Sequence, residues 1–333
     1  MTRPYALLRA GFPFHQTIGM RRVTTYPMDV AFGDDGMLFV LNRNDGAGGE
    51  IRRTNWDDED LDTIGKGFVW PVQIIRDAGE TFYVSDEGNH TISKWDRDGA
   101  SKGSWGEHGD GDGQLNRPSG IALDGDGNML VADTLNHRVQ RFTTDGKFLG
   151  KFGSFGTGPG ELNMPWGVAV DEDGTVLVAD WRNDRVQRFS ANGEFISQFG
   201  SSGSGDGQLN RPAGVSIDMH GDIFVADRGN NRIAQFDHTG RYVDQFIGDA
   251  TLSKSGRIYI MSNPKVLRAR EMTTLEESRR LRGPAAVRFN GDDGFMYIPD
   301  FGSHRIQVYR KEAQVLTEDE IWPEQKSPFL YTV

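Results

Sequence analysis

Three stretches in the middle of the chain repeat one pattern of hydrophobic and polar positions. Each contains short segments in which apolar residues alternate with polar or small ones, which is typical of half-buried β-strands. Turns such as "GDGN", whose residues tolerate positive φ, separate these segments. The copies read RPSGIALDGDGNMLVADTLNHRVQRF at 117–142, MPWGVAVDEDGTVLVADWRNDRVQRF at 164–189 and RPAGVSIDMHGDIFVADRGNNRIAQF at 211–236. With the segment that follows it, each copy predicts a sheet of four antiparallel strands.

A lone sheet of this size exposes an apolar face, and stacking such sheets around an axis buries both faces, as in a β-propeller. Segments that resemble the second strand of each copy lie at 38–40, 82–84, 129–131, 176–178, 223–225, 258–260 and 296–298. We therefore predict an all-β, single-domain β-propeller with seven blades of four antiparallel strands. A glycine-rich link such as GSGDGQLNRP, at 203–212, has no counterpart before the unit around 258–260, and "TTLEESRRL" at 273–281 has helical character. Six blades with one irregular insertion is the alternative.

The two ends of the chain predict how the ring closes. The last unit has three predicted strands, and the segment 11–19, GFPFHQTIG, resembles a fourth. Pairing this segment with the last blade closes the ring and covers strand edges that otherwise invite aggregation. We expect a propeller over 1–312 and a C-terminal tail over 313–333.

The repeat resembles that of the NHL-repeat family. The shared motif has a Pro-x-Gly start, then DxDGxxxVAD, NxR(V/I)xxF and GxFxxxFG, and weaker copies extend it over roughly 26–311. The resemblance implies the propeller fold. It leaves the function open, because the family includes peptide-amidating lyases, RNA-binding and protein-binding propellers, and sensor domains of kinases.

Residues that stay constant between the copies are expected to build the blades. An aspartate ends the second strand and an arginine follows five residues later, at 133/138, 180/185, 227/232 and 300/305. An ion pair at this spacing can hold the intervening loop through charge-assisted hydrogen bonds. We assign these residues, and the asparagines between them, to the scaffold.

Residues that vary between the copies are free to serve a ligand. In propellers of this family, the position directly after the aspartate faces one end of the central channel. These positions hold Asn42 or Arg43, Glu87, Thr134, Trp181, Arg228, Asn263 and Phe301, a mixture of charged and aromatic groups expected of a binding pocket. Along the first strands, Asp29 and Gln73 are polar exceptions among small or apolar residues. The predicted ligand-binding residues are Arg43, Gln73, Trp166, Trp181, Arg228 and Phe301.

Two functions fit this set. The first is a propeller scaffold that binds a protein or a small polar ligand at the mouth of the channel. The alternative is a lyase or hydrolase of a small polar substrate, with Glu87 or Asp29 as the catalytic base, because burial raises the pKa of a carboxylate. The sequence leaves open whether the protein is an enzyme.

No metal ligand is predicted and no cofactor is required. The amidating lyases that the chain resembles carry zinc-binding histidines after the first proline of a blade. Here these positions hold Met28, Val72, Ser119, Trp166, Ala213 and Ala285, so zinc ligation of that type is not expected. Asp29 and Gln73 alone offer few oxygens, and a weakly held Ca²⁺ or Mg²⁺ completed by water stays open.

Charge and composition limit the kinds of partner that we expect the protein to bind. The net charge of −11 disfavours nucleic acids and anionic membranes. The chain has no cysteine, which removes disulfides and thiolate chemistry, and no stretch approaches eighteen consecutive apolar residues. The N-terminus lacks the pattern of a secretory signal, so we expect a cytoplasmic protein, or a secreted one if a signal has been trimmed. The sequence does not define the oligomeric state.

Overall fold

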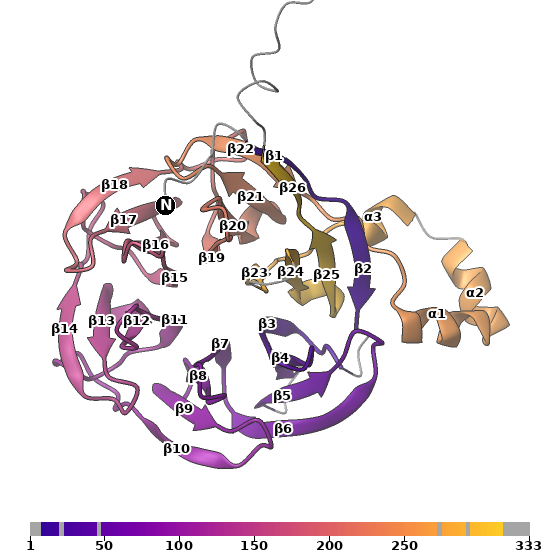
Figure 1. Cartoon of the computed structure of the whole chain (residues 1–333), viewed down its shortest axis with the longest axis horizontal. Helices are drawn as coiled ribbons and strands as arrows, with labels where there is room; N and C mark the ends of the chain where they lie inside the picture. The colour runs from indigo at the N-terminus through magenta and orange to yellow at the C-terminus, as the bar shows by residue number, and fades with distance from the viewer. Residues whose placement is uncertain (1–7, 20–22, 45–47, 272–274, 291–293, 316–333) are drawn as a thin grey trace, which may run out of the picture.

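Six four-stranded sheets surround a central axis in the computed structural model, which describes residues 8–19, 23–44, 48–271, 275–290 and 294–315 (Figure 1). The chain is an all-β propeller with six blades. The prediction of seven blades is therefore wrong, and the alternative of six blades with an irregular insertion is the arrangement observed. Among the described residues, no helix combines the length and apolarity needed to cross a membrane.

The first five blades each contain four strands that are consecutive in the chain and pair in sequence order. Blades 1 and 2 comprise β3 (Pro27–Phe32), β4 (Leu38–Asn44), β5 (Gly48–Thr54), β6 (Asp60–Phe68), β7 (Pro71–Arg76), β8 (Phe82–Asp86), β9 (Thr91–Trp95) and β10 (Ser101–Trp105). Blade 3 comprises β11 (Pro118–Leu123), β12 (Met129–Asp133), β13 (Arg138–Phe142) and β14 (Phe148–Phe152). Blades 4 and 5 comprise β15 (Pro165–Val170), β16 (Val176–Asp180), β17 (Arg185–Phe189), β18 (Phe195–Phe199), β19 (Pro212–Ile217), β20 (Ile223–Asp227), β21 (Arg232–Phe236) and β22 (Tyr242–Phe246).

The second strand of a blade is buried on both faces because a neighbouring blade covers each side. All five residues of β12, β16 and β20 are buried, which explains their nearly continuous apolar sequences. Phe142, Phe189 and Phe236, at most 1% exposed, fill the space between successive blades. Deeper in the ring, the first strands pack backbone to backbone. A Cβ on Gly167 would lie 2.4 Å from the carbonyl oxygen of Ala213, so glycine is required there.

The sixth blade joins both ends of the chain. Its strand order is β2 (Phe14–Ile18), β25 (Arg305–Arg310), β24 (Phe295–Asp300) and β23 (Arg288–Phe289), with β2 on the outside. The predicted pairing of 11–19 with the last blade is confirmed, and Ile18 faces Ile306 in the register. Next to this seam, β1 (Leu8–Gly11) pairs with β26 (Glu312–Val315). Most of the predicted tail, 316–333, lies outside the described residues.

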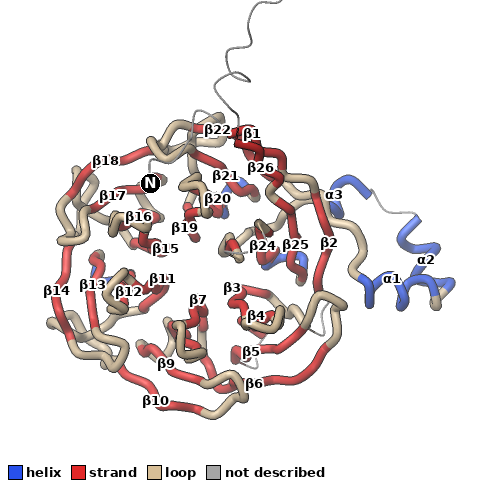
Figure 2. The backbone as a smooth tube through the Cα atoms, viewed as in Figure 1, coloured by secondary structure: helices blue, strands red, loops and turns tan. Residues whose placement is uncertain are grey.

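A helical insertion replaces the additional predicted blade. It consists of α1 (Lys254–Met261), α2 (Pro264–Glu271) and α3 (Leu275–Arg279) and lies at the outer side of the ring of strands (Figure 2). The segment 258–260, predicted as a strand, belongs to α1. Ser253 caps this helix by accepting a hydrogen bond from the N–H of Gly256. Asp58 of blade 1 accepts hydrogen bonds from the N–H and hydroxyl of Ser255, which anchors the helix to the ring.

Among the described residues, one recurring contact occurs at five of the six joints between blades, all except the joint of blades 1 and 2. A side chain in the turn after the second strand accepts a hydrogen bond from the backbone N–H that precedes the first strand of the following blade. The pairs are His90 with Arg117, His137 with Met164, Asp184 with Arg211, Asn231 with Gly283, and His304 with Tyr26, at 2.7–3.1 Å. We call these contacts the latches.

Candidate ligand-binding site

The variable positions after the second strands lie at one end of the ring, because they are structurally equivalent in all six blades. Three of them begin short 3₁₀ turns, namely η2 (Thr134–Asn136), η3 (Arg228–Asn230) and η4 (Phe301–Ser303). The register resolves the choice in blade 1. Asn42 pairs with Pro27 as Asp86 pairs with Pro71, so Arg43 is the equivalent of Glu87.

The recurring aspartates and arginines beneath these positions, which we call the frame, are held by internal hydrogen bonds. In blade 3, Asp133 accepts hydrogen bonds from the N–H of Asn116 and from the side chains of Asn136, Arg138 and Gln140. Ion pairs of the same type, at 2.8 Å, recur at 180/185, 227/232 and 300/305. The scaffold role that the sequence predicts for these residues is confirmed, and they are not available to a ligand.

Side chains from blades 4, 5 and 6 meet above this frame. The guanidinium carbon of Arg228 lies 4.8 Å from the ring centroid of Phe301 and 5.6 Å from that of Trp166. Trp166 in turn meets Trp181 edge to face, with ring centroids 5.4 Å apart. Two arginine–aromatic contacts and one aromatic pair thus hold four of the predicted ligand-binding residues together.

Charged residues from blades 1 and 2 complete the group. Glu87 interacts electrostatically with Arg43, Arg117 and Arg228, and Arg43 with Arg228. We call Arg43, Glu87, Trp166, Trp181, Arg228 and Phe301 the rim cluster.

Burial changes the proton affinities of the charged groups. It raises the pKa of Glu87, and the nearby Arg43 and Arg117 oppose this rise. Burial, with a smaller contribution from the charge of Arg43, lowers the pKa of Arg228 to about 10. Arg228 therefore keeps its positive charge at neutral pH.

Two hydrogen-bond donors in the rim cluster are buried and unpaired. The Nη1 of Arg228 and the Nε1 of Trp181 have no hydrogen-bond partner in the described part of the chain. Buried donors are nearly always satisfied in folded proteins, so an unsatisfied pair in one cluster indicates strain or a function. The aspartates of the frame show no such deficit.

The rim also contains residues that the sequence analysis missed. Arg43 and Arg117 lie over the ring of Trp70, at 5.7 and 4.8 Å from its centroid, and Trp70 is 45% exposed. Trp70 and Arg117 precede the proline that starts the first strand of a blade. The residue at this position varies between the blades, although arginine occurs twice, at 117 and 211, and that variation was the available signal.

Asp29 and Gln73 do not join the rim cluster. Asp29 is fully buried, accepts two hydrogen bonds from Arg288 at 2.7 Å and a third from the N–H of Ile74 at 3.0 Å. Gln73 pairs with both the N–H and the carbonyl oxygen of Ile121. Both side chains therefore bridge the first strands of adjacent blades.

Thr134 and Asn263 do not belong to the rim cluster either. The Thr134 hydroxyl is buried, donates to the carbonyl oxygen of Pro165 at 2.8 Å and lies 2.5 Å from the hydroxyl of Ser119. Asn263 lies between α1 and α2 in the insertion, because the seventh blade to which it was assigned does not exist.

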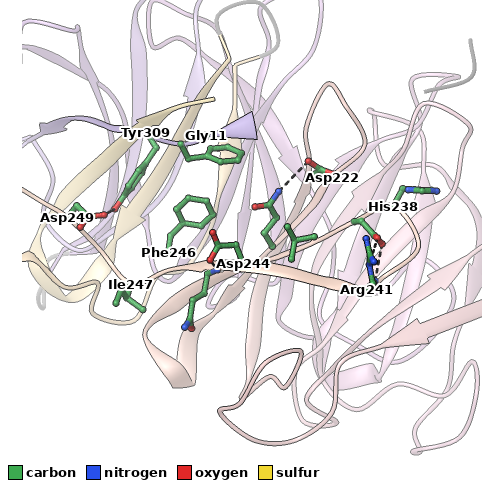
Figure 3. Close-up of a pocket in the computed structure, with 14 residues that line it drawn as sticks. Gly11, Asp222, His238, Arg241, Asp244, Phe246, Ile247, Asp249 and Tyr309 are labelled. Atoms are coloured by element: carbon green, nitrogen blue, oxygen red, sulfur yellow. Dashed lines mark hydrogen bonds and ion pairs between the residues drawn. The ribbon is translucent and has the colours of Figure 1, made fainter. Parts of the chain in front are cut away.

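A separate hollow of about 700 Å³ lies where blade 5 meets the closing seam (Figure 3). Phe246 and Tyr309, with ring centroids 5.5 Å apart, form one wall, and Asp222, Asp244 and Arg241 contribute charged groups. Between other neighbouring blades, the turn between the third and fourth strands of the later blade fills the corresponding space. In blade 4, for example, Gly193 of this turn packs against Phe152 of blade 3. Blade 6 has no such turn because its fourth strand comes from the N-terminus, so the hollow follows from ring closure.

The described residues contain no group of three or more histidine, aspartate or glutamate side chains arranged to hold a metal ion. The rim cluster combines guanidinium and indole hydrogen-bond donors, aromatic surfaces and one carboxylate.

The fold and this rim define a six-bladed β-propeller with a variable site at one end of its axis. Residues 115–142, 162–189 and 209–236 match the model of the NHL repeat, and they fall in blades 3, 4 and 5. The chain thus carries NHL repeats, as its motifs indicated. No curated protein sequence matches it.

Solved structures with low sequence identity share the fold. A protein of unknown function from Bacteroides thetaiotaomicron is 17% identical, with a TM-score of 0.64, covering 92% of this chain and 76% of that one. An inactive variant of virginiamycin B lyase from Staphylococcus aureus, solved with quinupristin, is 15% identical, with a TM-score of 0.56 and coverages of 91% and 88%. A gluconolactonase from Xanthomonas campestris is 14% identical, with a TM-score of 0.61 and coverages of 91% and 100%.

Proposed function

We propose that this propeller binds a small polar ligand at the rim cluster. The observation that carries the proposal is the pair of buried, unpaired donors on Arg228 and Trp181. A ligand that accepts hydrogen bonds from both groups would remove the cost of leaving them unsatisfied. The surrounding aromatic residues supply the apolar walls that small-molecule sites need.

The rim cluster differs from the frame of aspartates and arginines, and this difference supports a ligand-binding role for the rim cluster. The aspartates at 133, 180, 227 and 300 are saturated with internal hydrogen bonds, and each recurs from blade to blade. The residues of the rim cluster vary between the blades, and two of them retain unpaired donors. A protein partner is the other occupant that this surface could take, since Trp70 and Val69 beside it are 45% and 49% exposed. The half-buried position of Arg228 and Trp181 favours the small ligand.

A thermal-shift screen of organic acids, sugars, amino acids and short peptides tests the proposal. Compounds that stabilise the parent protein should lose their effect with Trp181→Ala and with Arg228→Ala. Arg241→Ala is the matched control, because Arg241 lies in the outer turn of blade 5 and pairs with Asp237. Ligands that stabilise both rim variants as well as the parent would overturn the proposal.

The second candidate is a lyase or hydrolase that uses Glu87 as a general base. Its support is the raised pKa of Glu87, since a carboxylate with a higher proton affinity is a better base near neutral pH. Asp29 is the weaker choice because Arg288 and Ile74 already occupy its oxygens. Two of the similar structures are a lyase and a gluconolactonase, so quinupristin and gluconolactone are the first substrates to assay. Glu87→Gln should abolish any turnover, and full activity in that variant would exclude this mechanism.

A further inference from the structure

We infer that the ligand of the rim cluster is a small organic anion, with a carboxylate or phosphate group joined to a flat apolar body. This inference rests on the proposed function and specifies its ligand. It follows from the charges, the hydrogen-bonding deficit and the aromatic surfaces of the rim.

Positive charge is in excess at this end of the ring. Arg43, Arg117 and Arg228 each interact electrostatically with Glu87. The neighbouring Asp86 adds a second negative charge, so the three arginines still outnumber the two carboxylates. Its oxygens already accept hydrogen bonds from the N–H groups of Val69 and Trp70. A local excess of arginines in a chain of net charge −11 favours an anionic ligand over a neutral or cationic one.

The Arg228 guanidinium is arranged to bind an anion at its edge. Phe301 and Trp166 contact this group through their rings. No hydrogen bond joins it to a described residue, and its Nη1 is buried. Stacking fixes the plane of a guanidinium and leaves its N–H groups for the paired oxygens of a carboxylate or phosphate, which match the spacing of those donors.

The aromatic residues define the rest of the ligand. Trp166, Trp181 and Phe301 offer apolar surface next to Arg228, and the unpaired Nε1 of Trp181 can donate to a second oxygen. The ring of Trp70, which is 45% exposed, offers a further aromatic surface beneath Arg43 and Arg117. A small inorganic anion would leave these surfaces uncovered, whereas an aryl or alkyl anion would bury them.

Isothermal titration calorimetry of the full chain with three matched probes tests the inference. The probes are phenylacetate, phenyl phosphate and the neutral phenylacetamide, in buffer of low ionic strength because exposed charges are screened by salt. We expect at least one of the two anions to bind, and which one binds identifies the headgroup. We expect the amide not to bind.

The variants Arg228→Gln and Arg241→Gln provide a second test of the inference. Arg228→Gln should weaken anion binding by about tenfold or more, because a charge-assisted hydrogen-bond pair is lost. Arg241→Gln should bind like the parent. Circular dichroism and the melting temperature of each variant establish that it is folded, and Arg228→Lys, which keeps the charge but not the paired donors, should fall between the parent and Arg228→Gln.

Three results would overturn the inference. They are equal binding of amide and anion, parent-like binding by Arg228→Gln, and no binding of either anion to the parent at millimolar concentration. The proposed function, binding of a small polar ligand at the rim cluster, can still hold if the ligand is not an anion. If neutral ligands from the thermal-shift screen depend on Trp181 and not on Arg228, the site is real and its ligand is not an anion. If neither residue affects any ligand, both proposals fail.

Discussion

The Nδ1 of His304 accepts a hydrogen bond from the backbone N–H of Tyr26 at 3.1 Å, and this contact joins the sixth blade to the first. His90 and His137 make the same latch between other blades at 3.0 Å. In blade 5, the Oδ1 of Asn231 takes the same role. An imidazole can accept at Nδ1 only when that nitrogen carries no proton. Three of the five latches therefore require a neutral histidine.

We expect the protein to lose stability as the pH falls below neutral. Burial lowers the pKa of His90 and His137 below the ordinary value of 6.5. The unfolded chain then binds protons at a higher pH than the folded one, so this contribution to stability is complete above pH 6.5 and declines through the window down to the lower folded values. Breaking each latch costs about 1 kcal/mol. Calorimetric melting temperatures between pH 5 and pH 8 measure the effect.

The double variant His90→Asn and His137→Asn is the control for this prediction. Asparagine serves in the same latch at residue 231, and it tolerates the left-handed backbone that both histidines adopt, with φ of 58° and 56°. The variant should melt at a less pH-dependent temperature than the parent between pH 5 and pH 7. An unchanged pH dependence would show that the latches do not titrate.

Asp29→Ala should destabilise the protein by about 3 kcal/mol or more, because it leaves Arg288 and the N–H of Ile74 without their buried partner. Asp34→Ala is the comparison, since Asp34 pairs with Arg76 while its side chain is 71% exposed, and its loss should cost less than about 1 kcal/mol. Urea unfolding measures both values. Equal effects would contradict the bridging role assigned to Asp29.

Two glycines should respond in opposite directions to alanine. In Gly167→Ala, the new Cβ would meet the backbone of blade 5 and destabilise the protein by about 1–3 kcal/mol. In Gly150→Ala, the new Cβ has no neighbour within 4 Å, and the lower backbone entropy of the unfolded chain should stabilise the protein by about 0.5 kcal/mol. Denaturant midpoints separate the two cases, and a neutral Gly167→Ala would contradict the close packing of the first strands.

Glu87→Gln should strengthen the binding of phenylacetate by about threefold, because it removes a negative charge from the rim cluster. In the parent, affinity should rise as the pH falls through the raised pKa of Glu87, since protonation has the same effect as the substitution. The variant should lack this pH dependence. Weaker binding by Glu87→Gln would indicate that Glu87 mainly orients the arginines.

The sequence was sufficient to predict the repeated blades, the closing strand and the frame of aspartates and arginines. All three are encoded in local patterns that recur along the chain. The segment 258–260 was assigned wrongly because three apolar residues in a row fit a short helix as well as a strand. Asp29 was taken for a site residue because its partner, Arg288, lies in the opposite part of the chain. Variation at the rim indicated most of the rim cluster, but the unpaired donors on Arg228 and Trp181 depend on packing and could only be found in the structure.

The outermost strand of the sixth blade, β2, is synthesised before the first five blades, and its partner β25 is synthesised after them. Until β25 is made, β2 has an unpaired edge, and the neighbouring surface of blade 1 stays uncovered. A product that stops before β25 cannot complete the ring, and its bare edge exposes it to proteases and to other chains. The seam therefore distinguishes chains that contain β25 from chains that stop before it.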